Sequence, residues 1–328
     1  MNIQSGLNVD PRPRRAEAFG ELVARLSTQS VAKHYDAYRD IQWDEPSHRI
    51  DPDDERWTLP DDDPLACTGW YRAQPPAVKS RVGLHMAATF MKIGIQFESV
   101  LKRGLLEFAQ ALPNGAPEFR YAYHEVCEEA QHSLMFQEFV NRSGFDPPGL
   151  AGWRLWLGRG IARGAEKFPA LFFVAVLAGE EPIDHIQRSL LHGGRPLPAV
   201  LERIMRIHVT EEARHLCFAR QFLRREVPGL SAAQRLRLRL RAPLLLRNMA
   251  QAMLCASPEV ARMHGIPRNA LAEAYALQNQ RFAVRLRGAV AKTRELCEEL
   301  DLIGPATRPI WRRLGLVQEH PSGYRTEH

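Results

Sequence analysis

Four long segments with helical hydrophobic spacing most constrain the fold of this chain. Apolar residues such as Met91, Ile95 and Leu101 recur every three or four positions, which is the pattern of a helix that buries one face. Glycine, proline or serine interrupts the pattern after each segment. The four segments cover residues 77–112, 117–141, 169–192 and 198–226. Two long helices, an interruption and two more are typical of a bundle, so we predict an all-α protein with a four-helix bundle core.

The rest of the chain fits around this core as parts of one domain. We expect a single all-helical domain over residues 1–328, with the core bundle at about 76–227 and peripheral helices within 231–300. Those peripheral helices are predicted at 232–255 and 268–300. Residues 41–63, rich in Asp and Pro, are expected to form a long loop that lies on the surface or covers another element. The first 15 residues and the last ten are predicted to be frayed.

Composition excludes several classes of protein. Arg12, Arg14 and Arg15 have no apolar segment behind them, so the start does not resemble a signal peptide, and the apolar run 170–179 is about half of what a membrane span needs. The five cysteines form no CxxC pair, which favours a soluble protein of a reducing cytoplasm. The net charge is +6, but the arginines of 235–241 alternate with leucine and lack interleaved aromatics. We interpret them as a solvated basic face beside an apolar one, and expect neither a nucleic acid nor a membrane as partner.

Two ExxH motifs carry the chemistry of the predicted core. A Glu and a His three residues apart lie on one helix face, one turn apart, where both can reach the same metal ion. Glu129 with His132 and Glu212 with His215 both lie inside predicted helices. A third match at 45–48 contains proline, and we treat it as a chance match. Ferritin-like di-metal proteins need one such motif from each of two helices and a Glu from each of the other two.

Two further positions support a metal site of this kind. Glu98 lies on the apolar face of its helix, three residues after Ile95, where an unpaired carboxylate would be costly. His208 lies one turn before Glu212, so that His208, Glu212 and His215 share one helix face. Because a lone helical histidine is more often solvated, it is this registry that favours a ligand role for His208.

The third helix offers two adjacent carboxylates, Glu180 and Glu181. Glu180 follows Val176 on the apolar face, and choosing it also places Asp184 and Gln187 in the interior stripe. We therefore prefer Glu180 and keep Glu181 as the alternative, expected at the bundle edge, solvated or holding a supporting partner. Ordinary charged helix faces are the competing interpretation of all these residues. Ordinary charged helix faces do explain three other glutamates, which we assign to solvent or to a supporting position beside the ligands: Glu125, Glu128 and Glu211.

These motifs make the chain resemble the p-aminobenzoate N-oxygenase (AurF-like) family of non-haem di-iron oxygenases over nearly its whole length. The resemblance lies in four sequence segments: GIQFESVL, YHEVCEEAQHSLMF, LAGEEPID and RIHVTEEARHLCFAR. His208 occupies the position of the histidine that distinguishes this family from other ferritin-like proteins. The loop after the third helix is one residue longer than the family pattern, which keeps Glu181 open. The resemblance implies seven ligands: Glu98, Glu129, His132, Glu180, His208, Glu212 and His215.

The resemblance also implies a function. Two iron ions, with manganese as the alternative metal, would activate O2 to oxidise the nitrogen of an aryl amine, with electrons from an external donor. A hydroxylase or desaturase acting on another substrate is an alternative, and a ferroxidase or storage protein is another. The latter fits less well because over 100 residues follow the fourth helix. No acid or base outside the ligand set and no organic cofactor is predicted, and a homodimer is compatible with the pattern.

A flat organic substrate would need an apolar pocket near the ligands. Five aromatic residues flank the ligands in the sequence and are candidates to line it, although an aromatic residue at helical spacing more often belongs to the core. They are Phe97, Tyr123, Phe136, Phe172 and Phe173.

Overall fold

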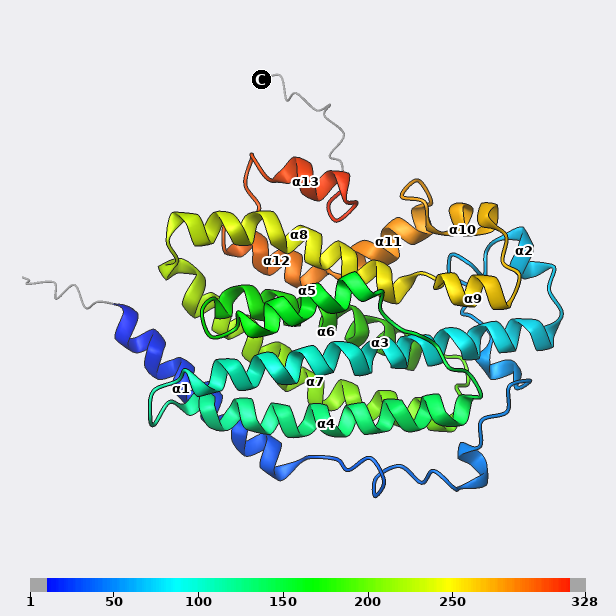
Figure 1. The fold of residues 1–328 in the computed structure, drawn as a ribbon, viewed down its shortest axis with the longest axis horizontal. Coiled ribbons are helices and arrows are strands. Elements are labelled where there is room, and N and C mark those ends of the chain that lie inside the picture. Colours follow the sequence, from blue (N-terminus) through cyan, green and yellow to red (C-terminus); the bar gives the residue numbers. More distant parts are fainter. Residues whose placement is uncertain (1–10, 319–328) are drawn as a thin grey trace, which may run out of the picture.

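The fold is a helical bundle wrapped by shorter helices. The computed structural model describes residues 11–318, and no strand occurs among them. Four long helices form the core: α3 (Pro76–Gln110), α4 (Pro117–Ser143), α6 (Pro169–His192) and α7 (Ala199–Glu226). In Figure 1, α3 lies along α4, with α6 and α7 behind them. This arrangement confirms the predicted all-α fold with a ferritin-like four-helix core.

The ends of the core helices follow from local sequence. Pro76, Pro117 and Pro169 each stand at the first turn of their helix, where the missing N–H of proline costs nothing. Gly144 ends α4 in the left-handed conformation with φ of 77°, which glycine adopts without strain. Each predicted boundary lies within two residues of the observed one.

Shorter helices surround the core. They are α1 (Pro11–Ala32), α2 (Gly69–Arg72), α5 (Gly152–Arg163), α8 (Ala232–Leu254), α9 (Pro258–Met263), α10 (Arg268–Tyr275), α11 (Gln280–Ala289), α12 (Ala291–Glu299) and α13 (Arg308–Arg313). The helix predicted at 232–255 corresponds to α8. The single helix predicted at 268–300 is wrong, because the chain breaks after Tyr275 and again at Val290 to form α10, α11 and α12.

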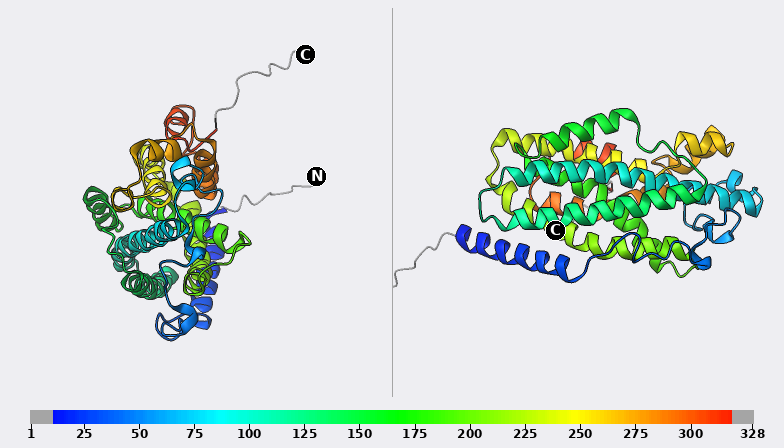
Figure 2. Two further views of the ribbon diagram at one scale, coloured as in Figure 1. Left: turned by 90° about the vertical axis from the view of Figure 1, so that its right-hand side faces the viewer. Right: turned by 60° about the horizontal axis from the view of Figure 1, so that its bottom comes forward.

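Helices α1 and α5 were not expected from the sequence. Residues 11–15, predicted to be frayed, belong to α1, whereas 1–10 and the last ten positions lie outside the described residues. Helix α1 runs along the outside of α4 and α7 (Figure 2) and buries Phe19, Val23 and Leu26 against them. Helix α5 contains several glycines, so its local helix propensity is low and packing against α3 and α6 stabilises it.

Segment 41–63 is a long surface connection with buried anchors, in line with the loop expected there. It contains the short 3-10 helices η1 (Pro46–His48) and η2 (Glu55–Trp57). Ile41, Trp43 and Trp57 are buried against the bundle. The loop backbone at Trp57 comes so close to α3 that a Cβ at Gly83 would overlap its carbonyl oxygen. Glycine at this position therefore allows the loop to pack against the start of α3.

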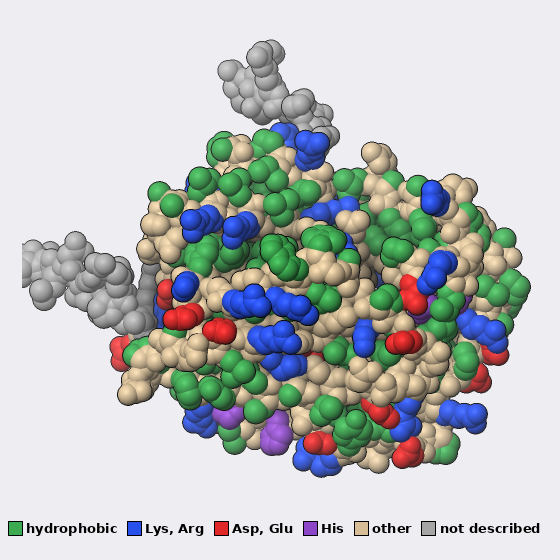
Figure 3. Space-filling view, viewed as in Figure 1, with side chains coloured by type: hydrophobic (Ala, Val, Ile, Leu, Met, Phe, Trp, Pro, Cys, Tyr) green, Lys and Arg blue, Asp and Glu red, His purple; other side chains and the backbone are tan. Residues whose placement is uncertain are grey.

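Basic and apolar side chains lie next to each other on the surface rather than on separate faces. Figure 3 shows Lys and Arg groups interspersed with exposed hydrophobic ones. On α8, Leu236 and Leu240 are exposed as well as Arg237 and Arg241. The predicted separation into a basic and an apolar face is wrong here, because a two-residue alternation distributes both types around a helix. No helix within residues 11–318 is both long and apolar enough to cross a membrane.

Candidate metal centre

The two ExxH motifs face each other in the middle of the bundle. His132 Nδ1 lies 3.4 Å from Glu129 Oε2 and 3.5 Å from Glu212 Oε1. His215 Nδ1 lies 3.0 Å from Glu129 Oε1 and 3.1 Å from Glu212 Oε1. Each carboxylate therefore reaches the imidazoles of both helices, which is the position from which it could bridge two metal ions.

The other predicted ligands come to the same place from α3, α6 and α7. His208 Nε2 lies 3.8 Å from Glu98 Oε1 and 3.7 Å from Glu212 Oε1. Glu180 contributes a carboxylate oxygen to a group with His208 and Glu212 whose atoms all lie within 4.8 Å of one another. All seven side chains predicted from the sequence are 0% exposed. The structure thus gathers them into one buried cluster, which we call the carboxylate–histidine cluster.

Many polar atoms of this cluster have no hydrogen-bond partner among the described residues. They include both oxygens of Glu180, both nitrogens of His208, Nδ1 of His132 and Oε1 of Glu98. Buried polar atoms without a partner are rare in folded proteins, because each costs free energy comparable to a lost hydrogen bond. Bound cations would satisfy them.

The electrostatics also favour cations in the cluster. Burial raises the pKa of Glu98 to about 8, and the nearby charge of Glu129 adds to the effect. Burial, followed by the charges of Glu212, Glu129 and Glu98, raises the pKa of Glu180 well above its usual range. Burial likewise lowers the pKa of His208 well below 6.5, so its imidazole is neutral, the form that binds metal. Divalent cations would stabilise the ionised carboxylates in place of protons.

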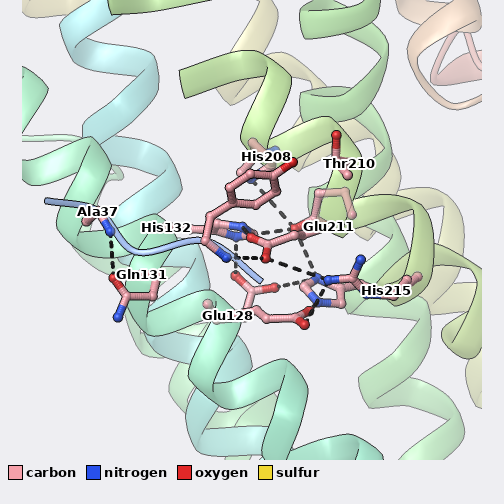
Figure 4. A network of polar contacts seen from close by, with 12 residues as sticks. Ala37, Glu128, Gln131, His132, His208, Thr210, Glu211 and His215 are labelled. Atoms are coloured by element: carbon pink, nitrogen blue, oxygen red, sulfur yellow. Dashed lines mark hydrogen bonds and ion pairs between the residues drawn. The ribbon is translucent and has the colours of Figure 1, made fainter. Parts of the chain in front are cut away.

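Two further carboxylates hold the ExxH histidines. His132 Nε2 donates to Glu211 Oε2 at 2.8 Å, and His215 Nε2 donates to Glu128 Oε2 at 2.7 Å (Figure 4). Each glutamate precedes the ExxH glutamate of its own helix and supports the histidine of the opposite helix. Arg214 lies between them, 2.8 Å from Glu128 and 3.6 Å from Glu211. These hydrogen bonds leave Nδ1 of both histidines free to face the cluster.

The two supporting glutamates are buried, so their predicted assignment to solvent is wrong and their assignment to a supporting position is right. Burial acts to raise the pKa of Glu128, but the hydrogen bond from His215 and the charges of His215 and Arg214 lower it to about 2. Glu128 therefore stays ionised beside the histidine.

Glu125 is a cluster member that sequence reasoning did not select as a ligand. It is 1% exposed. One of its carboxylate oxygens, a carboxylate oxygen of Glu129 and a ring nitrogen of His215 all lie within 4.8 Å of one another. Burial raises its pKa to about 8. Its position one helical turn before Glu129 was the available signal, since residues four apart share a helix face.

Glu98 is oriented by a polar chain from α3 and α4. Ser133 donates its hydroxyl hydrogen to Glu98 Oε2 at 2.7 Å. Lys102 in turn donates to Ser133 Oγ at 2.5 Å and to the carbonyl oxygen of Glu129 at 2.9 Å. This chain holds one carboxylate oxygen and leaves Oε1 free to face His208.

The segment that follows α1 covers one side of the cluster. The backbone N–H of Tyr35 donates to Glu211 Oε1 at 3.2 Å, and that of Ala37 donates to the side chain of Gln131 at 2.9 Å (Figure 4). The carbonyl oxygen of Lys33 accepts from Arg214 at 3.3 Å. Because these contacts join residues far apart in the chain, no sequence motif indicates them.

The two adjacent glutamates of α6 have different environments. Glu180 points into the cluster, whereas Glu181 accepts hydrogen bonds from the backbone N–H of Lys292, at 2.7 Å, and from the hydroxyl of Thr293. Arg220 lies 3.5 Å from the same carboxylate. Glu181 is 4% exposed, so it holds partners on α12 and is not solvated. This geometry favours Glu180 as the ligand.

The five aromatic residues proposed for a pocket have different environments. Tyr123 is 45% exposed, so its predicted pocket role is wrong. Phe136 and Phe173 are buried in the core. Phe97 and Phe172 line an apolar cavity of about 60 Å³ between α3, α5, α6 and α8. The ring of Phe97 lies where a Cβ at Gly179 would be, next to Glu180.

A second cavity, here called the end cavity, lies where α3 and α7 begin and α6 ends. Its volume is about 120 Å³, and the inward residues Met91, Gln187 and Met205 line it. Thr58 and Arg195 line both this cavity and a wider one of about 1290 Å³ nearer the loop segment. The end cavity is lined from the segment near η2 to Met91 and Gln187, each of which lies seven residues from a predicted ligand of the same helix.

The donor set fits a pair of first-row divalent cations. It consists of carboxylate oxygens and imidazole nitrogens without a thiolate, which suits iron or manganese and not a structural zinc site. The unpartnered atoms, the burial and the clustered carboxylates all agree with this fit.

Comparison with known proteins is consistent with the geometry. The family model described as P-aminobenzoate N-oxygenase AurF matches residues 17–301. Uncharacterized proteins of Mycobacterium tuberculosis and Mycobacterium bovis are 39% identical over 309 residues, which cover 94% of this chain and 90% of theirs. No solved structure matches the chain significantly.

Proposed function

This chain belongs to the p-aminobenzoate N-oxygenase AurF family, and from that premise we propose that it oxidises the nitrogen of an aryl amine with O2. Family membership implies a di-iron oxygenase with a small-molecule substrate. The observation that carries the proposal is the buried carboxylate–histidine cluster with its unpartnered donor atoms.

We assign the ligand roles to the seven clustered residues. Glu129 and Glu212 would hold metal together with both ExxH histidines, because each reaches the imidazoles of both motifs. The ligands that would complete the site are Glu98, His132, Glu180, His208 and His215. Iron bound there supplies the redox chemistry that activates O2.

The surrounding residues orient the side chains that would bind metal. Glu128 and Glu211 accept the Nε2 hydrogens of the two ExxH histidines and so fix the tautomer that exposes Nδ1. Lys102 and Ser133 orient Glu98. Complete burial of the cluster excludes bulk water, which would otherwise compete for the metal and intercept reactive oxygen species.

The reaction requires an external electron donor. Oxidation of an amine to a hydroxylamine places one oxygen atom on nitrogen and releases the other as water, which consumes two electrons and two protons. No organic redox cofactor motif occurs in the sequence. The electrons must therefore reach the cluster from a separate reductant.

Metal analysis and product analysis test the proposal together. Protein produced with ample iron should hold about two iron ions per chain, as ferritin-like di-metal sites do. When it is supplied with a chemical reductant, O2 and an aryl amine, mass spectrometry should detect the hydroxylamine or a more oxidised nitrogen product. One zinc ion and no second metal would refute the di-iron assignment, and a product hydroxylated only on carbon would refute N-oxidation.

A further inference from the structure

We propose that Gln187 is the specificity-determining residue of the end cavity, and that the cavity takes an uncharged aryl amine with a neutral hydrogen-bonding group opposite the amine. Gln187 would bind that group through its side-chain amide. This inference rests on the proposed function for the identity of the reacting nitrogen, and concerns which aryl amines the protein accepts.

The end cavity lies along the same inward helix faces as the predicted ligands. Gln187 follows Glu180 by seven residues and Met91 precedes Glu98 by seven, which is two helical turns in each case. At 1.5 Å per residue, Gln187 lies roughly 10 Å along α6 from Glu180. Helical side chains tilt toward the N-terminus of their helix, so the amide of Gln187 leans toward the cluster. The remaining separation is comparable to the length of one substituted benzene ring.

The buried side-chain amide of Gln187 indicates that the cavity binds a ligand. Its side chain is 0% exposed and lines the cavity, yet neither its amide oxygen nor its amide nitrogen has a hydrogen-bond partner among residues 11–318. A buried primary amide can donate two hydrogen bonds and accept two. Leaving all of them unmade is costly, so a polar group in the cavity would satisfy this side chain.

The walls around Gln187 are apolar. They include Met86, Phe90, Met91, Ile186, Leu190 and Met205. Such walls favour an aromatic or aliphatic body and leave one polar contact to set the orientation of the ligand.

The charged residues that line the cavity are either already paired or lie at its outer end. Asp63 is buried and forms an ion pair with Arg285 at 2.8 Å. Arg195 donates to the carbonyl oxygen of Arg56 at 2.8 Å and lies beyond the end of α6 at His192. His192 is twelve residues past Glu180, or roughly 18 Å along the axis, farther than one aryl ring reaches.

A carboxylate opposite the amine would therefore be buried near Gln187 without a cation. The cost of burying an unpaired charge exceeds what one amide hydrogen bond returns. A neutral group such as a carboxamide pairs with the glutamine amide without that cost. The cavity should consequently prefer neutral aryl amines over aminobenzoate anions.

Calorimetric titration under anaerobic conditions tests the preference on the iron-loaded protein without turnover. The probes are para-aminobenzamide, para-aminobenzoate and para-isopropylaniline, which share the ring and amine and differ in the opposite group. Wild-type protein should bind the benzamide at least about tenfold more tightly than the benzoate. Gln187→Leu should weaken benzamide binding about tenfold and tighten isopropylaniline binding, because an apolar side chain replaces the amide. Gln110→Leu, which changes an exposed glutamine at the end of α3, should match wild type.

The outcomes separate this inference from the proposed function. Equal binding of benzoate and benzamide to wild type, no binding of benzamide, or an equal loss of all probes in Gln187→Leu would each overturn the role of Gln187. The wild-type comparison needs no variant, so it remains decisive if Gln187→Leu does not fold. Selective benzamide binding without oxidation under turnover conditions would instead refute N-oxygenation and leave the binding role intact. If Gln187→Leu left the oxidation of para-aminobenzamide unaffected, the role of Gln187 would be refuted and the proposed function would stand.

Discussion

Exchanging either of the two adjacent glutamates of α6 for glutamine should affect metal binding and stability in opposite ways. We expect Glu180→Gln to lose metal and Glu181→Gln to retain it. Without metal, Glu181→Gln should be less stable than Glu180→Gln. The reason is that Glu180 has no hydrogen-bond partner in the described residues, whereas Glu181 accepts bonds from Lys292 and Thr293.

The size of the stability effect follows from these contacts. Glutamine at position 181 keeps one acceptor oxygen and replaces the other with a donor facing Thr293 and Arg220. Hydrogen bonds to a charged group contribute roughly 1.5–3 kcal/mol, so a loss of about 2 kcal/mol is expected. With an unfolding entropy of about 2.1 cal/mol/K per residue over 328 residues, this lowers Tm by about 3 °C. The pKa of Glu180 is raised well above its usual range, so Glu180→Gln replaces a neutral carboxyl and should not lower Tm.

Differential scanning calorimetry of both variants, with and without iron(II), combined with elemental analysis, measures these effects. Iron should raise the Tm of wild type and Glu181→Gln, but should not raise that of Glu180→Gln. A Glu180→Gln protein with a full complement of iron would refute the ligand assignment. If Glu181→Gln alone lost iron, the ligand would be one residue further along.

Three other measurements address the remainder of the site. His208→Ala should lower iron occupancy while far-UV circular dichroism stays near wild type, and full occupancy would remove the most family-specific ligand. Glu211→Gln should weaken metal binding about 10- to 100-fold, measured by chelator competition, because glutamine has no negative charge beside His132 and only one acceptor oxygen for the N–H groups of His132 and Tyr35; unchanged affinity would contradict that role. Burial raises the pKa of both Glu98 and Glu125 to about 8, so the folded metal-free protein holds protons that the unfolded chain releases above its pKa of about 4.5. The Tm of the metal-free protein should therefore fall as the pH rises from about 4.5 to about 8, and iron binding should release protons; a flat profile would contradict this.

The sequence alone was enough to predict the core of the fold and which seven side chains gather in the carboxylate–histidine cluster. Helical periodicity and proline or glycine at the ends are local signals, and they place the four core helices within two residues of the observed boundaries. The i, i+3 spacing of ExxH sets two donors on one helix face whatever the helix packs against. Helical phase likewise favoured Glu180 over Glu181, and it correctly placed Asp184 and Gln187 inside.

Other features depended on contacts between distant parts of the chain. Glycine-rich α5 and the breaks that divide 268–300 depend on packing that outweighs local propensity. The sequence does not show what a helical glutamate packs against, which is why both solvent and a supporting position stayed open for Glu125, Glu128 and Glu211, all of which are buried. Only the tertiary structure shows that Glu128 and Glu211 each accept a hydrogen bond from a histidine of the opposite helix. It also shows that the Gln187 amide faces an apolar cavity with no hydrogen-bond partner among residues 11–318. Spacing along one helix determines which side chains share a face, but which atoms meet across helices is decided by how the helices pack.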